Sequence, residues 1–396
     1  MEGSFIRWPT QITRASSSKV MDPITHIAAR QIVVPLDAPV WLGGSSVKER
    51  EYCLVEITSA NGLQGHALGF TRGADLVSPV LDQFAPCLLG QDPDDVERLW
   101  ECMYQRARLN GRQGLLMRAL SLLDIALWDL KAKQWKAPLH RVLGGYRDSI
   151  PVMMAGGYYS PTKGIPDLCA EFDRYAAEGF RYLKLIVGGA SMDEDAQRFA
   201  AVRNSLPPGI ELGVDANGAW EDPKAVLAWI QKCHAETGGL AFVEEPLPPE
   251  NRTGLSWLTA NSPVPVAVGE FIAGRWTFLE YMNSRCQDIV RADATLCGGI
   301  SEWKKIAAVA NAGNFPLIPH YFASLHLHPA LAIPGCRMIE VVSTAGRNSS
   351  FHLIAGRSFD LQNGMATSLN KPGLGLELDR DFIAAHTTCE RQITSS

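Results

Sequence analysis

The chain has 396 residues, 46% of them hydrophobic, which is enough to bury one large core and a smaller one. A formal net charge of −5 provides no basic surface for nucleic acid or an anionic membrane, and no apolar run is long enough to span a bilayer. The nine cysteines stand singly, without a C-x-x-C pair, which favours reduced thiols and a cytoplasmic location.

The first residues of the chain carry strand patterns after a polar start. Residues 1–22 lack the apolar stretch of a secretory signal, and we expect them to form a frayed N-terminus. Residues 23–70 read as strands, and the Asn61-Gly62 dipeptide within them is suited to a tight hairpin turn.

Helical periodicity follows these strands. It extends over residues 74–90 and 92–108, and then over a long segment, 115–145, that ends on a pair of glycines. Strands that precede helices indicate a unit of the α+β class. We therefore predict an α+β domain over residues 23–146.

The rhythm changes after about residue 147, where short apolar runs alternate with helical segments, as in parallel strands buried on both faces. Eight predicted strands recur: 150–157, 182–188, 210–217, 240–246, 265–271, 288–295, 315–321 and 336–342. Their spacing predicts a (β/α)₈-type barrel over residues 147–360. The rival, a doubly wound sheet, would carry a Gly-rich phosphate loop after its first strand, and AGGYYSPTKG is not one. The tail, 361–396, is expected to pack back on the first domain.

Polar side chains stand inside or at the end of seven successive predicted strands, where the chemistry of such a barrel is located. They are Lys184, Asp215 with Asn217, Glu244 with Glu245, Glu270, Asp293, His320 and Glu340. A single polar strand end has a plain explanation, because strand mouths meet water. Seven in succession favour an active site.

Three of these residues are acids on consecutive strands. Asp215, Glu244 and Glu270 would converge at the barrel mouth and would raise one another's pKa unless a cation lay between them. Ligation by hard oxygen anions suits Mg²⁺. Side chains alternate along a strand, so either Glu244 or Glu245 faces inward, and we favour Glu244 as the ligand.

Asp293 and His320 stand on adjacent strands. A carboxylate beside an imidazole fixes the ring tautomer and raises its basicity, which is typical of a general base. His326 and His328 lie just beyond, but no cysteine or acid near them completes a zinc site. We expect these two histidines to pack or to contact substrate, and His328 is a candidate for substrate contact.

Together these residues resemble the enolase superfamily, specifically its mandelate racemase-like branch. The resemblance runs from about residue 25 to the tail and rests on ALSLLDIALWDLKAK with LHRVLGG, VDAN, VEEP, GE, and D-A-x-x-x-G-G-I with the later P-H. It implies a modified (β/α)₇β barrel of the TIM type, covered by a capping domain that the N- and C-terminal segments form. It also implies that Mg²⁺ is held by the three acids, and that Asp293 and His320 are the family's dyad. Glu340 would then be the electrophilic acid facing the substrate carboxylate.

One position departs from the family pattern. Many relatives carry Lys-x-Lys at the second barrel strand, and here Lys184 is followed at that spacing by Ile186. Isoleucine cannot move a proton, so His320 is the one clear base, and Lys184 would hold the carboxylate or polarise the enolate.

We therefore expect one-base chemistry, in which His320 removes the proton α to a carboxylate. The hydrogen is a far weaker acid than an imidazolium of pKa about 6.5, so metal and hydrogen-bond donors must absorb the new charge. Loss of a β-hydroxyl would then give a 2-keto-3-deoxy acid from an acid sugar. Two alternatives stay open: a racemase or epimerase that uses Lys184 as second base, and a barrel without catalysis that serves in binding.

The expected partner is a small carboxylate substrate. In this architecture the capping loops set specificity, here around residues 39–50 and 109–114, where Trp41 and Arg112 are candidates for substrate contact. Asn217 is a further candidate at the barrel mouth. The resemblance also suggests a homo-oligomer.

Overall fold

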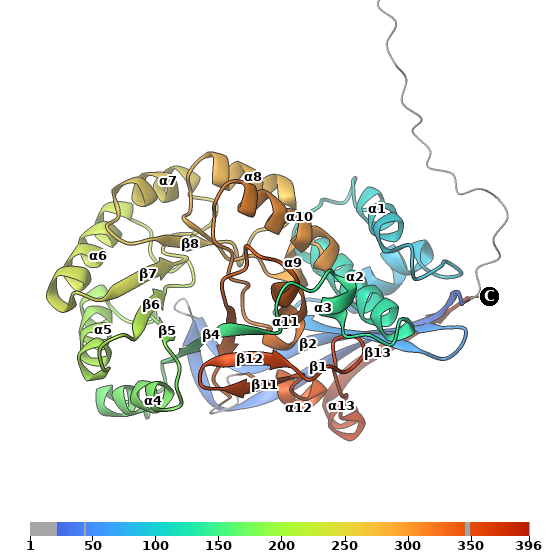
Figure 1. Cartoon of the computed structure of the whole chain (residues 1–396), viewed down its shortest axis with the longest axis horizontal. Helices are drawn as coiled ribbons and strands as arrows, with labels where there is room; N and C mark the ends of the chain where they lie inside the picture. Colours follow the sequence, from blue (N-terminus) through green and yellow to red (C-terminus); the bar gives the residue numbers. More distant parts are fainter. Residues whose placement is uncertain (1–21, 43–44, 345–348, 396) are drawn as a thin grey trace, which may run out of the picture.

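The structure is a computed structural model that describes residues 22–42, 45–344 and 349–395. The predicted frayed N-terminus, 1–22, lies outside this part of the chain except for Asp22. A barrel ringed by helices occupies the left of Figure 1, and an antiparallel sheet with its own helices lies at the right. Within the described residues, no helix combines the length and the apolar character that crossing a bilayer requires.

The sheet of the capping domain has four antiparallel strands in the order β13-β1-β2-β3. β1 (Ile24–Leu42) pairs with β2 (Ser45–Ser59), and β2 pairs with β3 (Gln64–Phe70). The turn between β2 and β3 contains Gly62 at a φ of 84°, a conformation that favours glycine and explains the asparagine-glycine pair there. β13 (Thr387–Thr394) adds to the edge of β1, so the end of the chain completes this sheet.

The helices of this domain differ in part from those predicted. α1 (Val96–Arg106) forms as expected, but the single helix predicted over 115–145 is divided into α2 (Gly114–Gln134) and α3 (Leu139–Val142). The break falls at Pro138, which has no N–H and disfavours the helical conformation in the residue before it. The helix predicted over 74–90 is reduced to η1 (Pro79–Phe84), a π-helical turn, and η2 (Ala85–Cys87), a 3₁₀ turn.

The barrel confirms the predicted fold class. Its parallel strands are β4 (Ser149–Gly156), β5 (Tyr182–Ile186), β6 (Glu211–Asp215), β7 (Leu240–Glu244), β8 (Val266–Val268), β9 (Ile289–Val290) and β10 (Ile339–Val342). Neighbours pair in chain order from β4 to β9, and β10 pairs in parallel with β4. Single bridges of Leu317 to Val290 and to Cys336 close the ring between β9 and β10.

The strand predicted over 315–321 is therefore present only as those bridges at Leu317. Pro316 and Pro319 flank this residue and have no N–H to donate, so a hydrogen-bonded ladder cannot extend in either direction. The segment still runs in the strand position and leads directly to His320.

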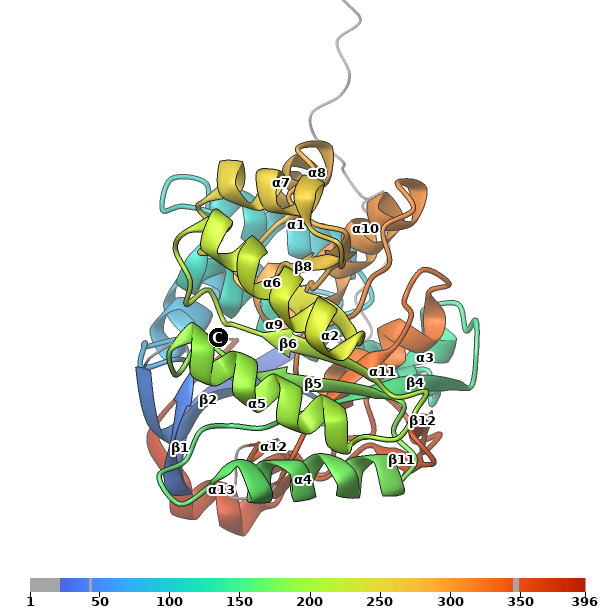
Figure 2. The same ribbon diagram turned by 90° about the vertical axis from the view of Figure 1, so that its left-hand side faces the viewer.

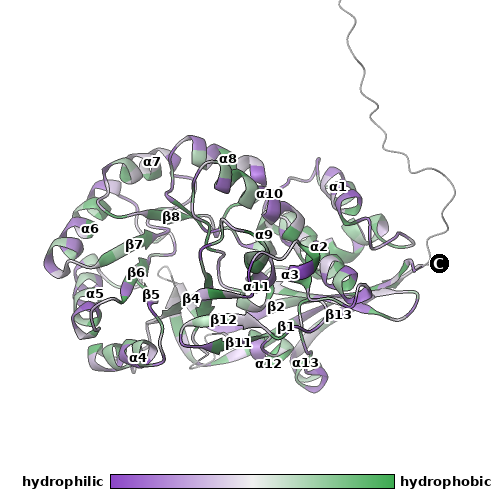
Figure 3. Cartoon of the chain, viewed as in Figure 1, coloured by the Kyte–Doolittle hydropathy of each residue, from purple (hydrophilic) through white to green (hydrophobic). Residues whose placement is uncertain are grey.

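Helices surround the barrel, and Figure 2 shows α4 to α7 stacked along its outer face. Those between the strands are α4 (Ile165–Ala177), α5 (Met192–Ser205), α6 (Pro223–Thr237), α7 (Arg252–Asn261), α8 (Arg275–Asn283), α9 (Ala294–Cys297), α10 (Gly299–Ala312) and α11 (Ala323–Ala332). The chain then forms α12 (Phe351–Ala355), β11 (Phe359–Gln362), β12 (Met365–Ser368) and α13 (Arg380–His386). Polar residues are concentrated on the outward faces of the outer helices in Figure 3.

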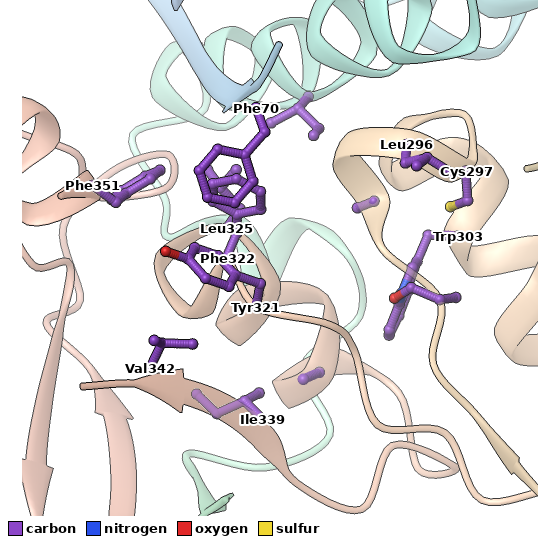
Figure 4. Packing of buried hydrophobic residues seen from close by; sticks show 14 of the residues in the cluster. Phe70, Leu296, Cys297, Trp303, Tyr321, Phe322, Leu325, Ile339, Val342 and Phe351 are labelled. Carbon is purple, nitrogen blue, oxygen red and sulfur yellow. The ribbon is translucent and has the colours of Figure 1, made fainter. Parts of the chain in front are cut away.

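An aromatic cluster joins the capping sheet to the barrel mouth (Figure 4). The ring centroid of Phe70, the last residue of β3, lies 4.8 Å from that of Tyr321 and 4.9 Å from that of Phe322. Both partners directly follow His320 in the chain. The capping domain thus packs on the loop that carries the predicted base.

A buried carboxylate forms a second joint between the domains. Asp124 on α2 accepts hydrogen bonds from the Ser301 N–H at 2.9 Å and from the Ser301 hydroxyl at 2.6 Å. Gly299 makes room for it, because a Cβ at that position would lie 2.3 Å from an Asp124 oxygen.

This joint predicts a pH dependence of stability. Burial raises the pKa of Asp124 to about 7, against about 3.9 for an unfolded aspartate. Between these values the folded protein binds more protons than the unfolded chain, so the free energy of unfolding falls as the pH rises through them. Asp124→Asn removes this titration and keeps one acceptor oxygen. Its Tm relative to wild type should increase from pH 5 to pH 8 in scanning calorimetry, and a difference that does not change with pH would contradict this assignment.

Candidate active site

Three carboxylates meet at the C-terminal mouth of the barrel. Asp215 and Glu244 end β6 and β7 and are paired in register, and Glu270 follows β8 by two residues. The three residues are at most 5% exposed, and one oxygen of each lies within 4.8 Å of the others. The structure thus brings together the acids that the sequence singled out.

This cluster suits a divalent cation. Burial and the neighbouring acids raise the pKa of Glu270 well above its usual value, and burial also raises the pKa of Asp215. Glu270 Oε2 and Asn217 Oδ1 are buried acceptors that no donor among the described residues satisfies. Hard oxygen ligands with excess negative charge are what Mg²⁺ binds in proteins, and a cation there would relieve the repulsion.

Lys184 is enclosed by acids. Its Nζ lies 2.9 Å from an Asp215 oxygen, 3.0 Å from a Glu244 oxygen and 2.9 Å from a Glu340 oxygen. Burial would lower the pKa of Lys184, but these carboxylates raise it well above its usual value. The Lys184 side chain is 1% exposed, so its ammonium group is a buried cation. It holds two acids of the triad that Asp215, Glu244 and Glu270 form.

A second buried cation, Arg291, was missed by the sequence reasoning. Its Nε lies 2.9 Å from a Glu244 oxygen, and a terminal nitrogen pairs with Glu340. Burial would raise the pKa of Glu340, but Lys184 and Arg291 lower it. The role that the resemblance implies for Glu340, an electrophilic acid facing the substrate carboxylate, stays a prediction, and the structure adds that two buried cations hold its carboxylate.

His320 and Asp293 form a hydrogen-bonded pair. His320 Nδ1 lies 3.0 Å from Asp293 Oδ2, and Oδ1 accepts hydrogen bonds from the Thr295 N–H and hydroxyl. Burial would raise the pKa of Asp293, but its hydrogen bond with His320 lowers it. The carboxylate therefore holds the Nδ1 proton, which leaves Nε2 as an acceptor 3.3 Å from Glu270 Oε2. A basic nitrogen faces the triad.

The two following histidines have other partners. His326 Nε2 accepts a hydrogen bond from the Ala294 N–H at 2.9 Å, and burial lowers its pKa to about 4. His328 Nδ1 accepts from the His140 N–H at 3.2 Å, and Nε2 lies 3.2 Å from the Leu374 carbonyl. The structure corrects the expectation of substrate contact at His328. Its ring is buried between α3 and α11 and does not line the cavity at the barrel mouth.

A cavity of about 330 Å³ lies between the triad, the dyad and the capping domain, a volume suited to a small metabolite. Its lining residues are Ser45, Phe70, Arg72, Arg118, Asn217, Glu270, Phe271, Asp293, Leu296 and His320. Asn217, Asp293 and His320 are thus placed at the cavity, as expected. The two arginines were not singled out from the sequence.

Trp41 and Arg112, the other candidates for substrate contact, do not line this cavity. Trp41 is half-buried and forms an isolated β-bridge with Tyr159 at the barrel mouth. The Arg112 guanidinium lies 3.8 Å from the Tyr104 ring centroid and donates to the Tyr104 carbonyl at 3.0 Å. Two of its nitrogens thus contact α1, and contact of Arg112 with substrate stays a prediction.

Comparison with known families agrees with this architecture. Residues 24–144 match the mandelate racemase / muconate lactonizing enzyme N-terminal domain, and residues 167–382 match the enolase C-terminal domain-like family. The chain belongs to the mandelate racemase-like branch of the enolase superfamily. The resemblance inferred from the motifs is confirmed.

Its relatives in the superfamily catalyse different reactions. Arabinonate dehydratase of Saccharolobus solfataricus is 32% identical over 86% of this chain and 91% of that protein. D-galactarolactone cycloisomerase of Agrobacterium fabrum is 31% identical over 91% of this chain and 97% of that protein. The crystal structure of L-talarate dehydratase from Polaromonas sp. JS666, complexed with Mg and L-glucarate, has a TM-score of 0.82 at 29% identity and covers 95% of this chain and 100% of that one. These relationships identify the chain as an enzyme of the superfamily.

In this superfamily member the second position of the Lys-x-Lys pattern is Ile186, which cannot act as an acid or a base. Ile186 ends β5, is 2% exposed and does not line the cavity. The described lining residues include one imidazole, His320, and no lysine.

Glu245 supports the triad from outside the cavity. One oxygen of this buried side chain accepts hydrogen bonds from the Gly269 N–H at 2.7 Å and the Glu270 N–H at 3.0 Å. Removal of such a support typically costs 10–100-fold in metal affinity. Glu245→Ala should therefore weaken Mg²⁺ binding by about that factor in titration calorimetry. Glu245→Gln keeps the accepting oxygen and should stay close to wild type, and equal losses in both variants would contradict the supporting role.

Proposed function

We propose that this chain is an Mg²⁺-dependent dehydratase that converts an acid sugar into a 2-keto-3-deoxy acid. The observation that carries the proposal is the single base. His320 Nε2 lies 3.3 Å from Glu270 Oε2 at the metal triad, and the position of the family's second base is the buried Ile186. Dehydration needs one group that removes a proton and returns it to the leaving hydroxyl.

His320 carries the proton through the reaction. Its Nε2 takes the proton from the carbon α to the substrate carboxylate, and an enediolate remains. Asp215, Glu244 and Glu270 would hold Mg²⁺, which would supply positive charge to stabilise the negative charge developing on the substrate. The C–O bond at the β-carbon then breaks, and the leaving hydroxide takes the proton from the His320 imidazolium and departs as water. The enol tautomerises to the 2-keto acid.

Lys184 and Glu340 serve this site by holding other groups. The ammonium of Lys184 lies about equally close to three acids. Neither Lys184 nor Glu340 lines the cavity. A racemase needs an acid-base group on each face of the substrate carbon. The enclosure of Lys184 therefore argues against the alternative in which this lysine is the second base.

A screen of acid sugars tests the proposal. The purified protein is incubated with single aldonic and aldaric acids, with Mg²⁺ or with excess EDTA, and 2-keto acid is measured as the semicarbazone. We expect at least one acid to lose one water and yield a 2-keto acid when Mg²⁺ is present, and no acid to do so with excess EDTA. A product of unchanged mass would instead identify a cycloisomerase or an epimerase and overturn the assignment to dehydration.

A further inference from the structure

Two arginines of the capping domain line the cavity opposite the barrel acids. Arg72 follows β3, and Arg118 lies in the first turns of α2. Among the described residues, neither guanidinium has a carboxylate partner: Arg118 donates to the Phe70 carbonyl at 3.4 Å, and Arg72 lies 4.7 Å from the Phe70 ring centroid. Arg118 is half-buried and Arg72 is exposed. Two cations without a carboxylate partner at one cavity repel each other and attract an anion. The pair therefore indicates a site for an anion.

The loop that carries Arg72 is held in one conformation. Arg72 has a φ of 56°, in the left-handed region that non-glycine residues rarely adopt. Its neighbours are tied to β2, since the Thr71 N–H donates to the Glu51 carbonyl at 3.0 Å and the Gly73 N–H donates to the Glu51 carboxylate. Strained residues that their surroundings hold in place occur mainly at functional sites.

The two acidic residues that line the same cavity have other roles in the proposed site and do not neutralise these arginines. Glu270 is a ligand of the proposed metal site, and Asp293 holds the His320 Nδ1 proton. Burial lowers the pKa of Arg118, the charge of Asp293 raises it, and the charge of Arg72 lowers it again. Arg72 and Arg118 line the same cavity, and an anion between their like charges would be favoured there.

The first carboxylate of the substrate has its place at the metal, because its α-carbon must reach His320 Nε2. An anion site on the capping side of the same cavity therefore suits a second carboxylate. We infer that Arg72 and Arg118 bind the distal carboxylate of a dicarboxylic acid sugar, so that the enzyme prefers aldarates, which carry a carboxylate at each end, to aldonates. This inference rests on the proposed dehydratase function.

Matched acids that differ at one end test it. Values of kcat/KM are measured on galactarate with galactonate and on glucarate with gluconate, for the Mg²⁺-loaded wild type and for Arg72→Asn, Arg118→Gln and Arg98→Gln. Asparagine tolerates the left-handed conformation at position 72, and Arg98 is an exposed control paired with Asp95 on α1. Removing one partner of a desolvated charge pair costs at least about 30-fold in binding.

We expect the wild type to prefer the diacid. Arg72→Asn and Arg118→Gln should each lower kcat/KM on the diacid by about 30-fold or more, mainly through KM, and change it less than about threefold on the monoacid. Arg98→Gln should change neither value. Equal losses on both acids, or a wild type that prefers the monoacid, would overturn the inference.

A binding measurement separates this inference from the proposed reaction. If no acid is dehydrated, the dehydratase proposal fails, and the same acid pairs are titrated into the Mg²⁺-loaded protein in a calorimeter. Tighter binding of the diacid that is lost in Arg72→Asn and Arg118→Gln supports the distal carboxylate site. Equal binding of diacid and monoacid overturns it.

Discussion

Replacing His320 with asparagine is expected to stop deuterium exchange at the α-carbon of the substrate and to lower turnover by a factor on the order of 10²–10⁴. Asparagine has no basic nitrogen, although its amide can still approach Asp293 and preserve much of the local packing. The loss should therefore lie in kcat, with substrate binding and the Tm close to those of the wild type. Exchange in D₂O, followed by NMR, measures the proton removal directly and does not depend on product release.

Two further variants make this result specific to the base. His26→Asn changes a histidine of the capping sheet and should leave exchange unchanged. Lys184→Met removes the cation between three acids and is expected to lower stability. If His320→Asn retained exchange and a folded Lys184→Met variant had none, Lys184 would be the base and the assignment to His320 would be wrong.

The second large effect is expected at the metal site. Glu270→Gln removes one of three oxygen anions, so Mg²⁺ affinity should fall by more than the roughly 100-fold that loss of a supporting residue can cause. The metal-free variant should be at least as stable as the metal-free wild type, because one of three mutually repelling buried carboxylates is gone. Added Mg²⁺ should raise the Tm of the wild type and leave that of Glu270→Gln unchanged.

Glu250→Gln provides the matched control for this comparison. Glu250 is an exposed acid in the loop between β7 and α7, close in sequence to the triad ligand Glu244. The Glu250→Gln variant should bind Mg²⁺ with the affinity of the wild type, and added Mg²⁺ should raise its Tm by the same amount. A Glu270→Gln variant with the Mg²⁺ affinity of the control would show that the ion, if one binds, is held elsewhere.

The barrel could be predicted because its strands are buried on both faces and leave continuous apolar runs in the sequence. Departures arose where proline removes backbone donors. Pro316 and Pro319 reduce the seventh strand to bridges at Leu317, and Pro138 divides the long helix of the capping domain. These prolines are visible in the sequence, but the periodic apolar pattern around them predicted a continuous helix and a continuous strand.

The acids of the site could be predicted because each stands at the end of an apolar run. Their partners could not, since pairing across the barrel depends on three-dimensional position. Arg291 occupies such a run, DIVRADAT, and its charge was a usable signal. Arg72 and Arg118 lie far from the barrel motifs in sequence and reach the cavity only through domain packing.

The partners of Glu340 could not be predicted for the same reason. The resemblance implied that Glu340 faces the substrate, and in the folded chain Lys184 and Arg291 pair with it. A family pattern transferred residue by residue gives the position of a group. Which groups pair with it is seen only in the folded chain.

Anomalous diffraction from crystals grown with Mn²⁺, a hard cation that stands in for Mg²⁺, tests the central claim most directly. We expect one strong peak within bonding distance of oxygens from Asp215, Glu244 and Glu270, with His320 Nε2 exposed to the cavity beside it. Three carboxylates that point apart with no peak between them would contradict the account, because an imidazole alone cannot remove a proton beside a carboxylate.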